Sequence, residues 1–359
     1  SGTLTMSGSA VVASGNDVYL ASGTKVTIAG SLTGISPVAT ITPASYTEDT
    51  QILTIADGAD PTLAAEYEKF VLSDSDVWSI TEEGTLKKLF IGTKKPTEAK
   101  AVYDIVFSDG SATPYADGLT LSDDEKAAAI AVIFYKGTGL NSPDSEGNAD
   151  TTTERTLGVG LAQTQALWCG DPNGSNPGNA WNVLVEPIEC APNEGIFDYE
   201  TTAGNYTFPD TADKNGSDNL SQIAAYLPTQ TNSSNNYYTD DTGTAARYPA
   251  FYFGINYKDQ TESHVSGTDY EDNWYLPSIA ELLQLGKVVT DVNSAIGLCG
   301  GTLVKTSSGD NYYDYFSSSQ YENYSYCTEA YTMRFETPLC IGTDEKTSDS
   351  VYVLAIREF

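Results

Sequence analysis

The side chains of this chain that most readily ligate metals or act as nucleophiles are five cysteines and one histidine. The cysteines are Cys169, Cys190, Cys299, Cys327 and Cys340. They form no C-x-x-C pair and only His264 could join them, so a zinc site is not expected. An odd number of cysteines also prevents complete disulfide pairing within one chain. Isolated thiols are the favoured interpretation, and His264 is interpreted as an ordinary surface residue.

Two acidic or polar clusters could bind metals, but both have a simpler explanation. Asp123, Asp124 and Glu125 follow Ser122, which predicts a helix with a capping box and acidic residues at its positive end. Residues 171–182 place oxygen side chains at alternate positions, as in a calcium loop. The expected Gly is Asn176, Pro177 lies inside, and the closing Glu is Asn182. We interpret this segment as a turn cluster, with calcium as the lesser alternative, and expect no cofactor.

The composition excludes some partners. The formal net charge is −31, from 18 basic and 49 acidic residues. Such a surface repels nucleic-acid phosphates and anionic lipid. The chain is rich in Gly, Ser, Thr, Asn and Tyr, which is typical of strands and loops in exported surface proteins. No apolar run reaches the roughly 18–20 residues of a membrane span, and the chain begins like a mature protein without a signal peptide.

The repeated strand patterns predict two domains in an α+β chain. Residues 1–93 contain short alternating segments separated by Gly, Pro or Asp, which predicts a small β-rich N-terminal domain. Its first rungs are compatible with the end of a β-solenoid. Residues 94–359 form the second domain, with a strand at 102–107, a helix from Ser122, a strand at 131–135 and a short helix at 219–227. The aromatic segment 248–253 is predicted to be a buried anchor.

The last third of the chain contains the strongest structural signals. Pro277 and Ser278 precede Glu281, which predicts a second capping box and a helix with an apolar face. We expect another short helix at 292–298, ending at Gly300 and Gly301. The apolar segment 351–357 predicts a strand.

A tyrosine-rich segment lies between these elements. Seven Tyr lie between Asn311 and Tyr331, mixed with Asn, Ser, Asp and Glu. So many phenol hydroxyls would rarely all find partners in a core. Tyr with Ser and Asn is typical of binding loops. The segment is therefore predicted to be a recognition surface, with an exposed sheet that binds nothing as the alternative.

Three motifs in order carry a family resemblance. They are Asn273-Trp274-Tyr275-Leu276-Pro277-Ser278-Ile279-Ala280-Glu281-Leu282, then Phe316-Ser317-Ser318-Ser319-Gln320-Tyr321, then Ala355-Ile356-Arg357-Glu358-Phe359. Together they resemble the C-type lectin-like domain of formylglycine-generating-enzyme-like proteins. More narrowly, the chain resembles the variable proteins of diversity-generating retroelements, especially the treponemal type. Phe316 stands where that family usually has Trp.

The resemblance implies that residues from about 311 to 341 are diversified and displayed on a constant frame. In that family adenine-containing codons are randomised, which favours Asn, Tyr, Ser, Asp and Cys. The implied frame is Phe316 to Gln320, Phe335 and Val351 to Phe359. The implied ligand-binding residues are Tyr312, Tyr313, Tyr315, Tyr321, Asn323, Tyr324, Tyr326, Cys327, Arg334, Thr337, Leu339, Cys340 and Ile341.

The function expected from this resemblance is ligand binding without catalysis. The partners would be variable protein or glycan ligands. We expect a monomer at the cell surface, held at the outer membrane by a lipid anchor that the printed sequence does not contain. The alternatives are a glycan-binding adhesin of fixed specificity and, less favoured, a formylglycine-generating-type oxidase. The oxidase would need two adjacent cysteines, and Cys327 and Cys340 both fall in the implied variable segment.

Overall fold

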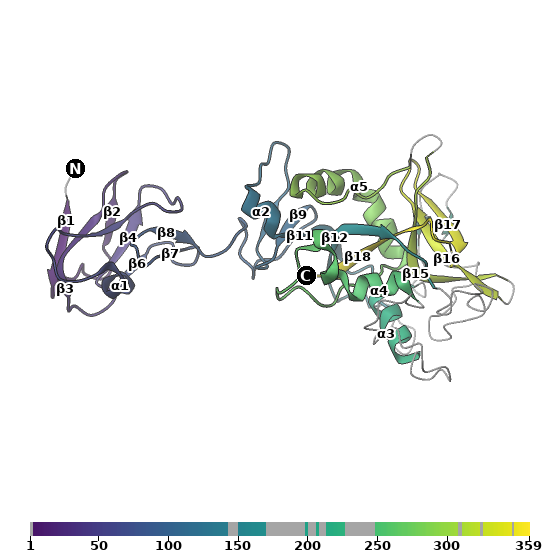
Figure 1. Ribbon diagram of the computed structural model, residues 1–359, viewed down its shortest axis with the longest axis horizontal. Coiled ribbons are helices and arrows are strands. Elements are labelled where there is room, and N and C mark those ends of the chain that lie inside the picture. Colours follow the sequence, from purple (N-terminus) through teal and green to yellow (C-terminus); the bar gives the residue numbers. More distant parts are fainter. Residues whose placement is uncertain are drawn as a thin grey trace. The chain divides into compact units, whose positions relative to one another are not determined.

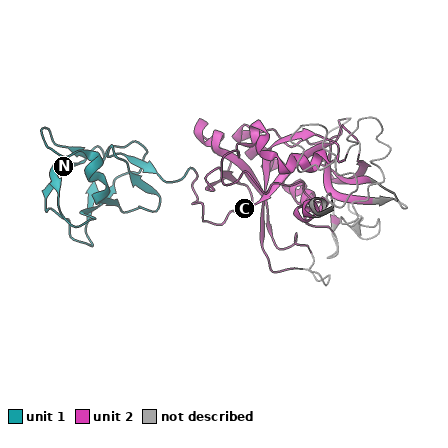
Figure 2. Ribbon diagram, turned by 60° about the horizontal axis from the view of Figure 1, so that its bottom comes forward, with its two compact units in different colours: residues 1–91 teal, residues 92–359 magenta. Residues whose placement is uncertain are grey.

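The chain is a mixed α+β protein that divides into two compact units, Ser1–Ile91 and Gly92–Phe359 (Figure 2). The sequence placed this division two residues later, after residue 93. The computed structural model describes residues 3–142, 150–169, 198–199, 206–207, 213–226, 248–307, 311–323, 326–346 and 348–359. None of the helices in these residues is both long and apolar enough to cross a bilayer.

The N-terminal unit is built from short strands that alternate between two parallel sheets. One sheet has the order β1-β3-β5 and the other β2-β4-β6. In β3 (Val26–Leu32) the buried positions alternate with less buried ones, so Val26, Ile28 and Leu32 point into the core. Alternation of successive strands between two parallel sheets is the arrangement of a β-solenoid rung, which agrees with the interpretation made from the sequence.

The remaining elements of this unit complete its core. The other strands of the two parallel sheets are β1 (Leu4–Gly8), β2 (Asp17–Leu20), β4 (Ala39–Pro43), β5 (Leu53–Ile55) and β6 (Phe70–Leu72). Four further elements pack against the same core. They are a short helix α1 (Leu63–Glu66), a 3-10 turn η1 (Tyr67–Lys69) and the two strands of a hairpin, β7 (Trp78–Ile80) and β8 (Leu86–Lys88). The predicted β-rich unit is confirmed.

The second unit is organised around an eight-stranded sheet with the order β10-β9-β11-β12-β18-β15-β16-β17 (Figure 1). Its strands are β9 (Asp104–Phe107), β10 (Ala112–Pro114), β11 (Ala129–Gly137), β12 (Arg155–Gln165), β15 (Asp314–Asn323), β16 (Tyr326–Arg334), β17 (Cys340–Glu345) and β18 (Tyr352–Glu358). Neighbouring strands are antiparallel except β15 and β18, which are parallel. A separate two-stranded ladder joins β13 (Asp198–Tyr199) to β14 (Tyr206–Thr207).

Helices cover both faces of this sheet. Figure 1 shows α5 (Ile279–Cys299) on one side and α4 (Pro249–Ile255) on the other. The alternation within β18 matches this arrangement, because Val353 and Ala355 join the aromatic cluster of α4, and Leu354 and Ile356 alternate with them. The other helical elements are α2 (Asp123–Ala128), α3 (Gly216–Tyr226), η5 (Tyr257–Asp259) and η6 (Thr261–Ser263).

Two helix predictions have different outcomes. Both capping boxes are present, because Ser122 and Ser278 each accept a hydrogen bond from the backbone N–H of the Glu three residues later. The separate helix expected at 292–298 is wrong, since α5 runs without a break to Cys299 and ends at Gly300 with φ 79°. Gly286 within α5 allows close packing, because a Cβ there would lie 2.9 Å from Leu339 Cδ2.

A buried ion pair joins the start of α5 to the centre of the sheet. Arg155 Nη1 on β12 lies 3.2 Å from Glu281 Oε1, and both side chains are almost completely buried. Tyr275 Oη accepts from Arg155 Nη2 at 2.8 Å and donates to Glu281 Oε1 at 3.0 Å. Glu281 Oε2 accepts from the backbone N–H groups of Ser278 and Gly216. One carboxylate thus connects β12, α5, α3 and the segment before α5.

We predict that Glu281→Ala lowers the free energy of unfolding by about 3–5 kcal/mol, because the Arg155 guanidinium loses its buried counter-charge and keeps only the half-exposed Glu358. Glu358→Gln is the matched control. Glu358 also contacts Arg155, at 3.2 Å, but its side chain is 49% exposed, so a loss of less than about 1 kcal/mol is expected. Urea denaturation of both variants provides the measurement, and equal losses would contradict the assignment.

Candidate ligand-binding face

A bulge in β15 forms the buried base of the predicted site. Phe316 pairs with Thr332 and Gln320 with Ala330, so the three residues between them on β15 oppose a single residue of β16, Tyr331. The three serines in between leave the regular ladder, and a bulge redirects backbone groups to other partners. Residues 316–320 are all buried, with exposed fractions of 0 or 1%. The expectation that these residues are buried is therefore confirmed.

The backbone and side-chain groups of the bulge serines form hydrogen bonds with several neighbouring segments. Ser317 Oγ donates to Tyr331 O at 2.8 Å, and Trp168 Nε1 donates to Ser317 O at 2.8 Å. Ser318 N donates to Pro277 O at 2.7 Å. These bonds satisfy buried backbone groups that the irregular strand leaves without ladder partners.

The other two serine hydroxyls connect the bulge to the helices. Ser318 Oγ accepts from Asn219 Nδ2 of α3 at 2.7 Å. Ser319 Oγ accepts from the backbone N–H of Ile279 at 3.1 Å and donates to Asp213 Oδ2 at 2.6 Å. Burial raises the pKa of Asp213, and the hydrogen bonds from Ser319 and Asn219 oppose that shift.

A buried lysine supports the far end of the bulge. Lys346, just after β17, is 1% exposed and donates to Gln320 Oε1. Its ammonium lies 4.4 Å from the centre of the Trp168 ring, a cation–π distance. Desolvation lowers the pKa of Lys346 to about 8, and the nearby Cys169 opposes this shift.

A partly exposed cluster lies at the open end of the same strands. Asp314 of β15 faces Arg334 of β16, which in turn faces Cys340 of β17. Arg334 donates to both carboxylate oxygens of Asp314, at 3.0 and 2.9 Å, and its guanidinium lies 4.6 Å from the centre of the Tyr312 ring. The hydrogen bonds that Arg334 donates to Asp314 raise the pKa of Arg334. We call Tyr312, Asp314, Arg334 and Cys340 the Tyr312–Arg334 patch.

Tyr315 is a correction to the predicted display positions, because it is fully buried. Successive side chains of a strand point to opposite faces, so Asp314 faces outward and Tyr315 faces inward. Its ring centre lies 5.1 Å from that of Phe335, and its hydroxyl accepts from Lys305 N at 2.7 Å and donates to Gln163 Oε1. Burial raises the pKa of Tyr315 well above its usual value.

The remaining predicted residues differ in exposure. Tyr312, 59% exposed, and Thr337 are exposed, whereas Tyr313, Tyr321, Arg334, Leu339, Cys340 and Ile341 are partly buried. Tyr313 contacts Tyr352 and Tyr321 contacts Tyr331, both edge to face. Asn323, Tyr326 and Cys327 lie where β15 turns into β16, but their side chains are outside the described residues. Tyr324 also lies outside them.

The other chemistry considered from the sequence has these outcomes. In the part of the chain that the structure describes, no three His, Cys, Asp or Glu side chains are grouped to hold a metal. The calcium-like segment 171–182 lies outside that part. Burial raises the pKa of Cys299 to about 12 and also raises that of Cys340, so both thiols stay protonated at neutral pH. His264 is partly buried, and its Nδ1 lies 2.9 Å from Ala129 O.

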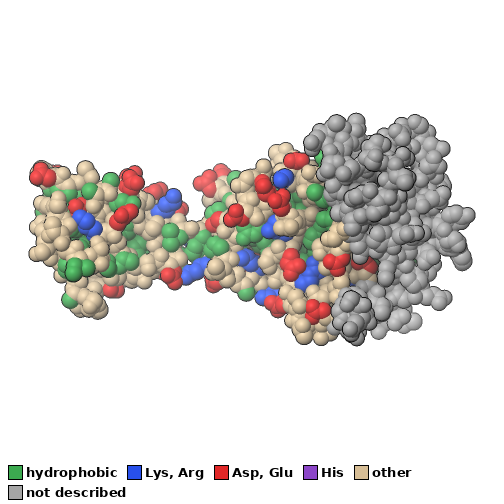
Figure 3. Space-filling model, turned by 90° about the horizontal axis from the view of Figure 1, so that it is seen from below, with side chains coloured by type: hydrophobic (Ala, Val, Ile, Leu, Met, Phe, Trp, Pro, Cys, Tyr) green, Lys and Arg blue, Asp and Glu red, His purple; other side chains and the backbone are tan. Residues whose placement is uncertain are grey.

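Several residues important for the face could not be recognised in the sequence. Trp168, Asp213 and Asn219 are distant in sequence but bond to the three serines. Lys346 was not selected because a lysine is ordinarily exposed. Figure 3 shows acidic side chains distributed over the described surface of both units, with fewer basic ones among them.

Comparison with known proteins gives little further information. No family model matches the chain, and no curated protein matches it. A solved structure of a fimbrial protein from Bacteroides ovatus is similar, with a TM-score of 0.43 and 16% sequence identity. The similarity covers 72% of this chain and 49% of the fimbrial protein, so the chain aligns with about half of that protein.

We predict that burying the Lys346 charge makes stability depend on pH. Below pH 8 Lys346 is protonated in both the folded and the unfolded chain, so the full free-energy cost of burying its charge is present. Between about pH 8 and 10.5 the folded chain releases it first, and stability rises with pH. The Lys346→Met variant has no proton to release at this position. The stability of the variant, measured relative to that of the original chain, should therefore fall between pH 7 and 10. The fall should approach 3 kcal/mol, at about 1.4 kcal/mol per pKa unit. A pH-independent difference in urea denaturation would contradict this.

Proposed function

We propose that this protein is a surface-displayed ligand-binding protein without catalytic activity. In this proposal the second unit is a C-type lectin-like domain, and its binding site is diversified by a retroelement. The protein is held at the outer membrane by a lipid anchor. Its ligands are proteins or glycans.

The observation that carries the proposal is the division of roles along one pair of strands. The bulge of β15 is fully buried and bonded to α3, α5 and Trp168. A few residues away, Tyr312 is exposed and Thr337 lies on the exposed β16–β17 connection. Diversification requires this arrangement, because substitutions at exposed positions are tolerated only when other residues maintain the fold.

The Tyr312–Arg334 patch has the chemistry of a recognition site. Tyr and Arg are the side chains enriched at binding hot spots, because they combine apolar area with hydrogen-bonding capacity. The two bonds to Asp314 hold the Arg334 guanidinium in place, and a side chain fixed before binding loses less entropy on binding. A ligand group that stacks on Tyr312 and hydrogen-bonds the guanidinium edge would fit this patch.

Different observations distinguish the proposed function from its two alternatives, the adhesin and the oxidase. A glycan-binding adhesin of fixed specificity would use the same patch but keep its sequence constant. The oxidase alternative is less well supported, because burial raises the pKa of Cys340 and so disfavours the thiolate that would ligate copper.

Sequencing the coding region for residues 311–341 in several isolates tests diversification. We expect substitutions at 312, 334, 337 and 339–341, with residues 315–320 unchanged, and adenine at the varied positions of a neighbouring template repeat. An invariant region would favour the adhesin. Substitutions spread evenly over buried and exposed positions would contradict the proposal.

The tolerance of the displayed positions can be measured on the protein itself. Tyr312→Ala and Thr337→Ala should change the free energy of unfolding by less than about 0.5 kcal/mol, as surface substitutions usually do. Ser318→Ala should cost about 1–3 kcal/mol, because the buried Asn219 donor then loses the hydroxyl as acceptor. Thermal or urea denaturation checks all three. A large loss for Tyr312→Ala would show that this position is structural.

A further inference from the structure

The outer face of one parallel sheet in the N-terminal unit begins a row of polar and aromatic side chains. The sheet is β2-β4-β6, whose strands are neighbours in Figure 1. Leu20 of β2 and Ile41 of β4 belong to the core of this unit. Successive side chains of a strand point to opposite faces, so Tyr19 and Thr42 point outward. These two residues are cross-strand partners, and Tyr19 is 67% exposed.

The row continues across β6 to two further aromatic rings. The register between β4 and β6 places Ser73, the residue directly after β6, opposite Thr42. The hydroxyl oxygens of Ser73 and Tyr46 lie 2.8 Å apart. The Trp78 ring lies next to the Tyr46 ring, with the two ring centres 5.6 Å apart, and both side chains are half-buried. The row therefore has one aromatic ring on β2 and two beside the end of β6.

The two rings beside β6 are held in place before any ligand arrives. Tyr46 Oη accepts from the backbone N–H of Asp74 at 3.2 Å, and the backbone N–H of Trp78 donates to Asp74 O at 3.0 Å. Both side chains also pack against the core of the unit. A side chain that is fixed in advance loses less entropy when a ligand binds.

The spacing of the rings fits a flat ligand with apolar C–H groups. Neighbouring strands lie about 4.8 Å apart, so β2 and β6 are separated by roughly 10 Å. The face of an aromatic ring carries partial negative charge and attracts the weakly positive C–H groups of a sugar ring. An extended β-linked sugar chain is a flat ribbon with C–H groups on its faces and hydroxyl groups along its edges. Such a chain can contact Tyr19 at one end of the row and the Tyr46–Trp78 pair at the other.

The charge on this face favours a neutral ligand over an acidic one. Asp17 lies on the same outward face of β2, is exposed, and accepts a hydrogen bond from Thr42 Oγ1 at 3.0 Å. A carboxylate can accept several hydrogen bonds, so Asp17 can also accept one from a ligand hydroxyl. The outward residues of the three strands are 17, 19, 40, 42 and 71, and none of them is Lys or Arg. An anionic ligand would therefore meet Asp17 without a counter-charge.

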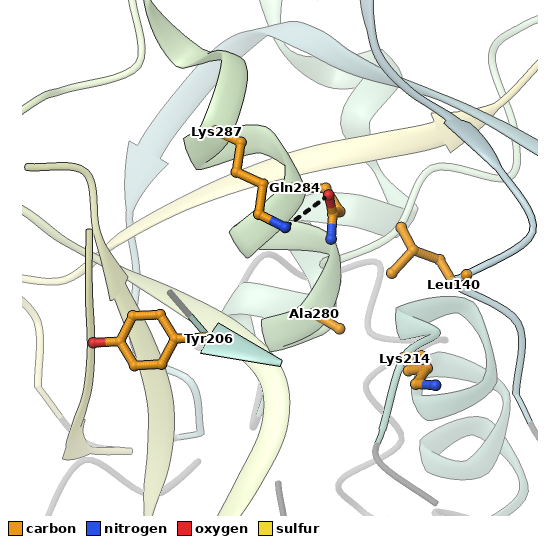
Figure 4. A pocket seen from close by; sticks show the side chains of 7 residues that line it. Leu140, Tyr206, Lys214, Ala280, Gln284 and Lys287 are labelled. Atoms are coloured by element: carbon orange, nitrogen blue, oxygen red, sulfur yellow. Dashed lines mark hydrogen bonds between the residues drawn. The ribbon is translucent and has the colours of Figure 1, made fainter. Parts of the chain in front are cut away.

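The pocket beside α5 in the second unit lacks such an arrangement among its described lining residues. Its volume is about 280 Å³, and its lining includes Lys287, which donates to Gln284 Oε1 at 3.3 Å (Figure 4). Leu140 and Ala280 of the lining are buried. Figure 4 shows Lys214 pointing away from Lys287. These groups do not converge on one ligand, whereas the row on β2-β4-β6 presents its side chains on one face.

We propose that the outer face of β2-β4-β6 binds a neutral, extended β-linked glycan. The sugar rings lie on Tyr19 and on the Tyr46–Trp78 pair, and the ligand hydroxyls between them bond Thr42 and Asp17. This site belongs to the N-terminal unit and has a fixed specificity. It does not rest on the function proposed for the Tyr312–Arg334 patch.

The test is isothermal titration of the full chain with cellohexaose and chitohexaose, which are flat and neutral. At least one of them should bind. Maltohexaose, whose chain is bent, and carboxymethylcellulose, which is anionic, should bind at least tenfold more weakly. Tyr19→Ala should weaken binding by roughly tenfold, the loss expected for one aromatic contact, whereas Tyr19→Phe should retain most of the affinity. Tyr312→Ala is the matched control, because Tyr312 is similarly exposed but lies in the second unit.

Four results would overturn the proposal. They are no binding of either flat glycan, equally tight binding of maltohexaose or carboxymethylcellulose, unchanged binding by Tyr19→Ala with its fold verified by circular dichroism, and an equal loss in Tyr312→Ala. A loss in Tyr312→Ala alone would place the glycan at the Tyr312–Arg334 patch and so support the function proposed above instead. Binding of poly-lysine that Tyr19→Ala abolishes, without binding of either flat glycan, would assign the face to a basic protein.

Discussion

The rest of the second unit depends on the buried contact between Arg155 and Glu281. The carboxylate completes the cap of α5, accepts the backbone N–H of Gly216 at the start of α3, and neutralises a guanidinium on β12. A buried ion pair is expensive to assemble but more expensive to break. It therefore restricts these elements to one arrangement more than it adds to net stability, and that arrangement brings the start of α5 against the β15 bulge.

The bulge makes this arrangement a support for the proposed binding face. Three consecutive serines would be poor residues for a regular buried strand, since each hydroxyl needs a partner. Here Asn219, Asp213 and the backbone of Tyr331 provide those partners. The polar groups of the bulge are satisfied internally, so they do not depend on the exposed side chain of Tyr312 nearby. In the proposed function, such exposed side chains are the ones that vary.

The acidic and the basic side chains of this chain also have different roles. So acidic a surface disfavours anionic partners. Four of the 18 basic residues have defined positions: Arg155 and Lys346 are buried, Arg334 is held by Asp314 at the patch, and Lys287 lines the pocket beside α5.

The sequence alone determined the local elements. Capping boxes and alternating strands depend on neighbouring residues, so the sequence identified Ser278 and Glu281 correctly. Through the family resemblance the sequence also led to the correct expectation that residues 316–320 are buried, but it did not indicate the bulge. It could not determine which face of β15 Tyr315 occupies, that α5 continues through 292–298, or that Lys346 is buried against Trp168. Those outcomes depend on strand register and on contacts between residues more than a hundred positions apart. Only the tertiary structure decides them, because burial and charge pairing are properties of the packed chain.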